Sequence, residues 1–167
     1  RSPSRGLGDV YKRQPTDKTT RPLKDMVRES IFNILEHSKN EKIKFKNDVV
    51  LDLFSGSGSF GIECLSRGVK KVFFFENYKP SLKILEKNIK ELEIDKVSVI
   101  KEINAYEISK ENINNEKINL IYLDPPFKDK NINKLLRKIL DLKIAHINTL
   151  IVTVSYTHLT LPTILRV

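Results

Sequence analysis

Four residues at the end of one apolar run could do chemistry on an amine. The run, LIYL, ends directly on Asp124, Pro125, Pro126 and Phe127. Because proline has a fixed φ and no N–H, this segment presents carbonyl oxygens in a rigid frame. The Asp124 carboxylate and the Pro125 carbonyl therefore form an acceptor-only pair, which suits an –NH2 group, and the Phe127 ring offers a face on which a planar base can stack. The alternative is a rigid surface turn that carries an aromatic residue by chance.

A second segment, DLFSGSGSFG, has the composition of a ligand-binding turn. Its glycines, Gly56, Gly58 and Gly61, have G-x-G-x-x-G spacing between an expected strand and an expected helix. Such glycines permit a tight turn and let a ligand contact bare main chain. Glu76 ends the next apolar run, 20 residues after Gly56, where nucleoside-binding folds place an acid that accepts both ribose hydroxyls. A turn that only packs a helix on a strand, and an acid that is only a surface charge, stay open as alternatives.

Apolar runs that alternate with helical patterns must position these residues. The patterns predict helices over residues 25–37, 59–67, 79–94 and 130–142, and strands over residues 48–54, 70–76, 96–100, 118–124 and 148–154. Strands that alternate with helices predict β–α–β units around a mainly parallel sheet. Because ligands lie beyond the carboxyl ends of such strands, we expect Gly56, Glu76 and Asp124 to meet at one edge.

The composition narrows the classes of function. With 167 residues, the chain is long enough for one domain with a buried core. No apolar stretch is long enough to cross a bilayer and no signal-peptide pattern opens the sequence, so we expect a soluble, cytoplasmic protein. The chain has one cysteine and three scattered histidines, so we expect no metal site. The net charge of +9 suits a polyanionic partner, although lysines spread over the whole surface would give the same total.

The two ends of the chain differ in character from the middle. Residues 1–14 and 155–167 lack the lysine-, isoleucine- and asparagine-rich composition of the intervening sequence and show no clear period. Both resemble translated adapter or vector sequence. We therefore expect a non-native leader, a non-native tail, and one functional domain over residues 15–154.

Three segments together resemble one enzyme family. The D-P-P-F motif is similar to the signature of S-adenosylmethionine-dependent methyltransferases that act on exocyclic amines of nucleobases. Residues 51–68 (LDLFSGSGSFGIECLSRG) and 21–35 (RPLKDMVRESIFNIL) resemble the cofactor loop and the N-terminal segment of one branch, the bacterial 16S ribosomal RNA guanine-N2 methyltransferases. The resemblance covers roughly residues 15–154. It implies a Rossmann-like methyltransferase fold, an α/β fold with a mainly parallel central sheet and helices on both faces, truncated here at both ends.

The resemblance also implies roles for individual residues. Asp124, Pro125, Pro126 and Phe127 would form the catalytic segment. Asn104 stands where the family usually has aspartate, and we expect a modest effect because an amide can also hydrogen bond near the adenine. The residues that would contact the cofactor are Asp52, Phe54, Gly56, Gly58, Gly61, Glu76, Asn77, Asn104 and Ala105. The residues that would contact RNA are Arg21, Arg28, Lys128 and Lys130.

These expectations combine into one function with three rivals. We expect methyl transfer from S-adenosylmethionine to the N2 amine of a guanine in 16S ribosomal RNA, as free RNA or in the small ribosomal subunit, by a monomer. The first rival is N6-adenine methylation of DNA or RNA, because D-P-P-F does not separate adenine from guanine. The others are a nicotinamide-dependent dehydrogenase, which would leave D-P-P-F without a role, and an inactive RNA-binding fragment.

Overall fold

The described residues form an α/β fold. The structure, a computed structural model, describes residues 25–37, 45–126, 131–155 and 161–166. In chain order its elements are α2 (Asp25–His37), β1 (Val49–Leu53), α3 (Ser59–Ser66), β2 (Lys71–Phe75), α4 (Lys79–Glu91), η1 (Asp95–Val97), β3 (Ser98–Lys101), η2 (Ala105–Glu107), η3 (Glu111–Ile113), β4 (Leu120–Leu123), α5 (Ile132–Asp141), β5 (Leu150–Ser155) and β6 (Leu161–Arg166), where η marks a short 3-10 helix.

The strands form one mainly parallel sheet. Their order is β3-β2-β1-β4-β5-β6, and only the β5–β6 pair is antiparallel. Every residue of β1 and of β4 is buried, which explains why these strands are continuous apolar runs in the sequence. The sheet predicted from the alternating pattern is therefore confirmed.

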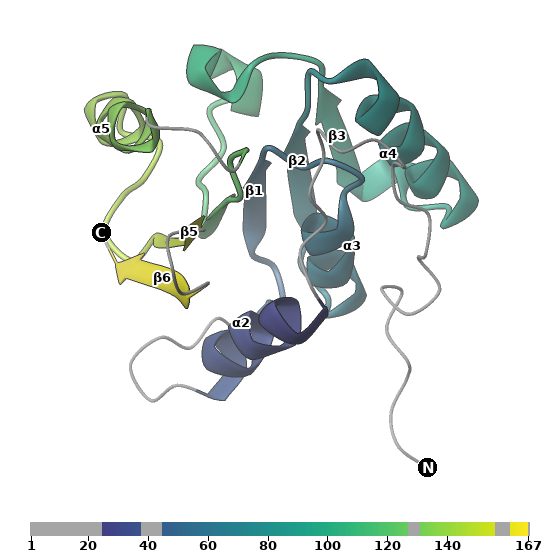
Figure 1. The fold of residues 1–167 in the computed structure, drawn as a ribbon, viewed down its shortest axis with the longest axis horizontal. Coiled ribbons are helices and arrows are strands. Elements are labelled where there is room, and N and C mark those ends of the chain that lie inside the picture. The colour runs from purple at the N-terminus through teal and green to yellow at the C-terminus, as the bar shows by residue number, and fades with distance from the viewer. Residues whose placement is uncertain (1–24, 38–44, 127–130, 156–160, 167) are drawn as a thin grey trace.

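The alternation of side chains along the strands creates a core on each face of the sheet. On one face, residues such as Val50 and Val72 pack with the apolar sides of α2, α3 and α4. On the other face, Leu51 and Phe73 pack with α5 and with the segments that contain η2 and η3. Figure 1 shows this arrangement, with α2 and α3 on one side of the sheet and α5 on the other. Helices therefore cover both faces, as the resemblance implied.

The chain changes its direction of travel across the sheet between β1 and β4. From β1 it proceeds outward through β2 to β3, then crosses to β4 on the other side of β1 and continues to β5. In open α/β sheets, ligands bind beyond the carboxyl ends of the strands at such a switch point. Leu53 at the end of β1 pairs with Leu123 at the end of β4, so Phe54 and Asp124 leave the sheet as neighbours.

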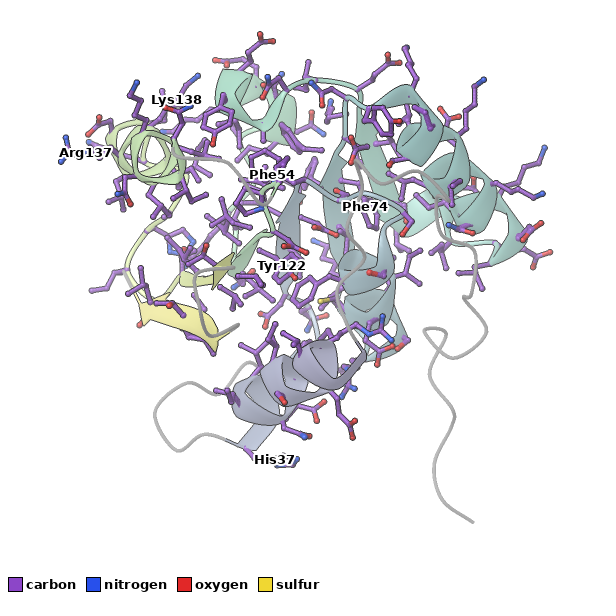
Figure 2. All side chains as sticks on the ribbon, in the orientation of Figure 1. His37, Phe54, Phe74, Tyr122, Arg137 and Lys138 are labelled. Atoms are coloured by element: carbon purple, nitrogen blue, oxygen red, sulfur yellow. The ribbon has the colours of Figure 1, made fainter. Side chains whose placement is uncertain are left out.

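An aromatic stack fastens α2 and α3 to β4. Phe32 of α2 stacks on Phe60 of α3 with ring centroids 5.0 Å apart, and Phe60 stacks on Tyr122 of β4 at 3.7 Å. The Arg67 guanidinium lies 4.4 Å from the Phe32 centroid and pairs with Glu36 of α2 at 2.5 Å. Figure 2 shows Tyr122 on the side of the sheet that α2 and α3 cover. The stack therefore braces the strand that leads into the D-P-P segment.

The last strand falls in the segment that was expected to be a non-native tail. β6 pairs with β5 along its whole length, from Leu161 opposite Ser155 to Arg166 opposite Leu150. Residues 1–24 and 156–160 lie outside the described residues. Strand pairing does not report whether a segment is native, so the boundaries expected near residues 15 and 154 stay predictions.

We predict that Phe60→Ala destabilises the fold strongly. The Phe60 side chain is only 2% exposed, and its ring contacts aromatic rings on two other elements. Its truncation should therefore lower the free energy of unfolding by about 3–5 kcal/mol, which urea denaturation followed by circular dichroism would measure. Ile34→Ala is a matched control because Ile34 is 39% exposed, and its loss should stay below about 1 kcal/mol. Equal, small losses in the two variants would contradict this account of the stack.

Candidate active site

Two of the three glycines after β1 are required for packing: Gly58, in the turn of residues 55–58 (the glycine turn), and Gly61, in α3. A β-carbon at Gly58, where φ is +86°, would lie 2.4 Å from the Leu85 side chain of α4. A β-carbon at Gly61 would lie 2.3 Å from the Phe74 ring. Gly56 differs, because a β-carbon there would meet no described atom within 4 Å. Packing thus explains Gly58 and Gly61. The positive φ of Gly56, +57°, favours glycine there on backbone grounds, and its open face leaves room for a ligand.

Glu76 joins the end of β2 to this turn. Its carboxylate accepts hydrogen bonds from the N–H groups of Gly56 and Tyr78, each at 2.7 Å, and its side chain is buried. Burial raises the pKa of Glu76, and the N–H groups of Tyr78, Gly56 and Asn77 oppose that rise. A carboxylate has about four lone-pair positions. Glu76 can therefore hold the turn and still accept hydrogen bonds from a ligand.

Asp52 is a buried acid behind the same turn. It is 1% exposed, and its Oδ2 accepts a hydrogen bond from the N–H of Gly61 at 3.1 Å. Its Oδ1 is buried and has no hydrogen-bond partner among the described residues. Burial raises the pKa of Asp52 well above its usual range, the Gly61 N–H opposes this, and the charges of Asp124 and Glu76 raise the pKa further. The three predicted acids therefore lie close enough to repel one another.

The D-P-P segment starts where β4 ends. The Asp124 side chain is partly buried, Pro125 is buried and Pro126 is exposed. Because Asp124 follows the residue that pairs with Leu53, it lies at the switch point with the glycine turn. Residues 127–130, which include Phe127 and both predicted RNA-contacting lysines, lie outside the described residues.

Two aromatic rings and an amide lie in the segments that follow β1 and β3. Phe54 has a positive φ, +64°, and its ring meets the Tyr106 ring edge to face at 5.8 Å. The Asn104 side chain accepts a hydrogen bond from the N–H of Tyr106 at 3.0 Å, and Lys138 of α5 donates to the Tyr106 carbonyl at 2.6 Å. Ala105 is buried. Figure 2 shows Phe54 where β1 ends and Lys138 on α5.

Comparison with known proteins identifies the family. The sequence model described as conserved hypothetical protein 95 matches residues 12–166, which is most of the chain. The chain belongs to this family. The curated relatives that it matches include ribosomal RNA small subunit methyltransferase D of Buchnera aphidicola subsp. Baizongia pistaciae, with 38% identity over 66% of this chain, and the protein of the same name from Haemophilus influenzae, with 36% identity over 64% of this chain. The chain spans 53% of the length of each of these relatives.

Solved structures support the same family fold. The Escherichia coli protein yhhF, described as a candidate methyltransferase, is 27% identical to this chain with a TM-score of 0.71, over 90% of this chain and 78% of its own. The Haemophilus influenzae protein HI0767, described as a candidate methylase, is 26% identical with a TM-score of 0.61, over 84% of this chain and 77% of its own. The Rossmann-like methyltransferase fold and the family predicted from the sequence are both confirmed.

The structure brings together most of the family residues that were predicted for the cofactor. Asp52, Glu76 and the glycine turn meet at the carboxyl ends of β1 and β2, and Asn104 lies just beyond the end of β3. Asn77, directly after Glu76, is exposed. Of the residues predicted to contact RNA, Arg28 is partly buried on α2, and Arg21 lies outside the described residues. The role of each residue stays a prediction.

The sequence analysis missed a buried amide under the turn. Asn88 of α4 is 3% exposed, and its Nδ2 donates a hydrogen bond to the Ser57 carbonyl at 3.1 Å. A signal was present, because an asparagine stands between Leu85 and Ile89 in the apolar stripe of an amphipathic helix. A buried amide at such a position needs hydrogen-bond partners.

Other classes of site receive no support from the described residues. Among them, no group of three or more histidine, cysteine, aspartate or glutamate side chains could hold a metal ion. None of the described helices is both long and apolar enough to span a bilayer. Cys64 of α3 is fully buried, and burial, assisted by Asp52 and Glu63, raises the pKa of its thiol well above the usual range.

We predict that Asp52→Asn makes the fold more stable at neutral pH. The folded-state pKa of Asp52 is raised, so ionisation destabilises the fold as pH rises from the unfolded-state pKa of about 3.9 through the folded-state value. Asparagine avoids this loss and keeps an oxygen for the Gly61 N–H. At pH 8 its Tm should exceed that of the unmodified protein, by about 2–4 °C for each kcal/mol regained, and the difference should shrink toward pH 4.

Differential scanning calorimetry at pH 4 to 8 would measure this effect. Asp95→Asn is the control, because Asp95 is exposed and its substitution should leave Tm unchanged at both ends of the range. A Tm for Asp52→Asn below that of the unmodified protein at pH 8 would contradict the prediction.

Proposed function

We propose that this chain binds S-adenosylmethionine and transfers its methyl group to RNA, specifically to the N2 amine of a guanine in 16S ribosomal RNA. One observation carries the proposal: Asp52, Glu76 and Asp124 lie together at the switch point of a methyltransferase fold. The names of the curated relatives, ribosomal RNA small subunit methyltransferase D, support RNA as the substrate class. The chain spans only about half the length of those relatives, so their activity is a proposal for this chain.

The residues at the site fit this cofactor. Its amino-acid part carries an ammonium group, and the buried Oδ1 of Asp52 is a carboxylate oxygen without a hydrogen-bond partner among the described residues. The open face of Gly56 leaves room against the backbone. Glu76 would hold the ribose hydroxyls through its remaining lone pairs. Asn104 and Ala105 would lie along the adenine, next to the Phe54 and Tyr106 rings.

When bound, the cofactor supplies a methyl group that is electrophilic because it is attached to a sulfonium. The amine is a poor nucleophile, since its lone pair is delocalised into the base. Asp124 and the Pro125 carbonyl would each accept one N–H and so direct the lone pair at the methyl carbon. As the nitrogen–carbon bond forms and the carbon–sulfur bond breaks, Asp124 would stabilise the positive charge on the nitrogen and pass the released proton to solvent.

The remaining expectations belong to the same proposal. Phe127 would stack on a base that is unpaired or swung out of its helix, and Lys128, Lys130, Arg21 and Arg28 would contact RNA phosphates. The proposed substrate is 16S ribosomal RNA, free or in the small ribosomal subunit, and the proposed state is a cytoplasmic monomer. N6-adenine methylation is the rival that shares this site, and the identity of the methylated nucleoside separates the two.

We predict that Asp124→Asn strongly impairs transfer and keeps cofactor binding. Asparagine places an N–H2 group where a carboxylate oxygen should accept from the substrate amine, so turnover should fall by about 10²–10³-fold. The affinity for S-adenosylhomocysteine, measured by calorimetry, should stay within about threefold, because Asp52 and Glu76 are unchanged. Transfer is measured with labelled cofactor and unmethylated 16S RNA or small subunits, and the product is read by nucleoside mass spectrometry.

Asp141→Asn provides the control for this experiment. Asp141 is the exposed last residue of α5, so its substitution should change neither binding nor turnover. Turnover by Asp124→Asn at the level of the control would refute the assignment of Asp124. N6-methyladenosine as the product would replace the guanine proposal with the adenine one.

A further inference from the structure

The glycine turn is held by hydrogen bonds from the end of β2, from α4 and within the turn itself. From β2, the Phe75 carbonyl accepts from the Ser55 N–H at 2.9 Å and the Glu76 carboxylate accepts from the Gly56 N–H at 2.7 Å. Within the turn, the Ser55 carbonyl accepts from the Gly58 N–H at 2.8 Å. From α4, the Asn88 amide donates to the Ser57 carbonyl at 3.1 Å. The first two residues of the turn are therefore held from the end of β2, and the third is held from α4.

The hydrogen bond from α4 is buried, and it requires a side chain at position 88 that can donate to the Ser57 carbonyl. Asn88 is 3% exposed and lies one helical turn from Leu85, whose side chain packs against Gly58. The same helix thus supports two successive residues of the turn, one through a hydrogen bond and one through van der Waals contact. A leucine at position 88 would cost less to bury than an amide, so packing alone does not explain asparagine there.

We propose that Asn88 is a positioning residue for the cofactor: its amide sets the orientation of the peptide between Ser57 and Gly58 and thereby the affinity of the turn for S-adenosylmethionine. A peptide group is planar, so fixing its carbonyl oxygen also fixes the direction of its N–H. The N–H of the same peptide belongs to Gly58 and donates to the Ser55 carbonyl at 2.8 Å, so a rotation of this peptide would break the hydrogen bond that closes the turn around Gly56. The inference rests on the proposed cofactor and adds a residue that lies behind the turn rather than in contact with the ligand.

Two substitutions remove the hydrogen bond in different ways. Asn88→Asp keeps the size of the side chain and replaces the donor with a carboxylate oxygen that repels the Ser57 carbonyl. Asn88→Leu introduces an apolar side chain with the same branching at Cγ and leaves that carbonyl without its donor. Ser81→Ala is the matched control, because Ser81 is fully buried on the same helix and its Oγ has no hydrogen-bond partner among the described residues.

The experiment measures the dissociation constant of S-adenosylhomocysteine by calorimetry, at a temperature where circular dichroism shows each variant to be folded. Both Asn88 variants should bind at least tenfold more weakly than the unmodified chain, and Ser81→Ala should bind within twofold of it. In transfer assays, the KM for S-adenosylmethionine should rise by the same factor, and the KM for RNA should stay unchanged. A purely structural role would lower Tm without moving the affinity of the folded protein.

The outcomes separate this inference from the proposed function. If the unmodified chain does not bind S-adenosylhomocysteine, the proposed cofactor itself is wrong. If the unmodified chain binds it and the folded Asn88 variants bind equally well, the positioning role is wrong and the proposed function stands. If Asn88→Leu does not fold, the isosteric Asn88→Asp decides.

Discussion

The burial of one carboxylate, that of Asp52, is the constraint on which the site depends. An acid in the middle of the sheet opposes folding unless something compensates it, and the structure provides a backbone N–H from the first turn of α3. That contact requires α3 to start close to β1. Such a close approach is possible because residue 61 is glycine, since a β-carbon there would collide with the Phe74 ring. Asp124 and Glu76 add further negative charge. The site is therefore a cluster of acidic residues in a chain of net charge +9, suited to a positively charged ligand.

The elements around this acidic cluster each hold one part of the site. β2 holds the glycine turn through Glu76, and α4 holds it through Asn88. β4 carries the D-P-P segment and is braced from α2 and α3 by the stack of Phe32, Phe60 and Tyr122. These supports come from both sides of the switch point. The relative position of the two halves of the site is thus set by core packing and not by the loops themselves.

Much of the fold could be predicted because buried parallel strands leave a simple signature. The run VVLDL predicts β1 even though it contains Asp52, since the residues around it are apolar. Element ends were harder to predict. The first strand was predicted to end at Phe54, but β1 ends at Leu53, because the positive φ of Phe54 turns the chain out of the sheet. The helix predicted over residues 79–94 ends at Glu91, because Glu93 also adopts a positive φ.

Gly56 and Glu76 were both predicted to contact a ligand, and in the structure they also form a hydrogen bond with each other. The sequence did not predict this contact. Spacing along the chain gives the edge of the sheet that a residue reaches, but not its hydrogen-bond partner. The Asn88–Ser57 contact and the stack on Tyr122 join residues that lie 31 or more positions apart or sit in unrelated patterns. Such contacts follow from the packing of α3 and α4 on the sheet. The apolar stripe of α4 indicates that Asn88 is buried, but the sequence does not indicate which group its amide contacts.

The burial of the only cysteine makes its thiol a probe of local opening in this fold. Cys64 lies in α3, on the helix that Asp52 anchors, and neither solvent nor base reaches its thiol while the helix is docked. The rate at which a thiol reagent modifies the chain therefore reports how often α3 separates from the sheet and exposes the thiol. A ligand that stabilises the glycine turn and the docking of α3 would slow this modification without contacting the sulfur.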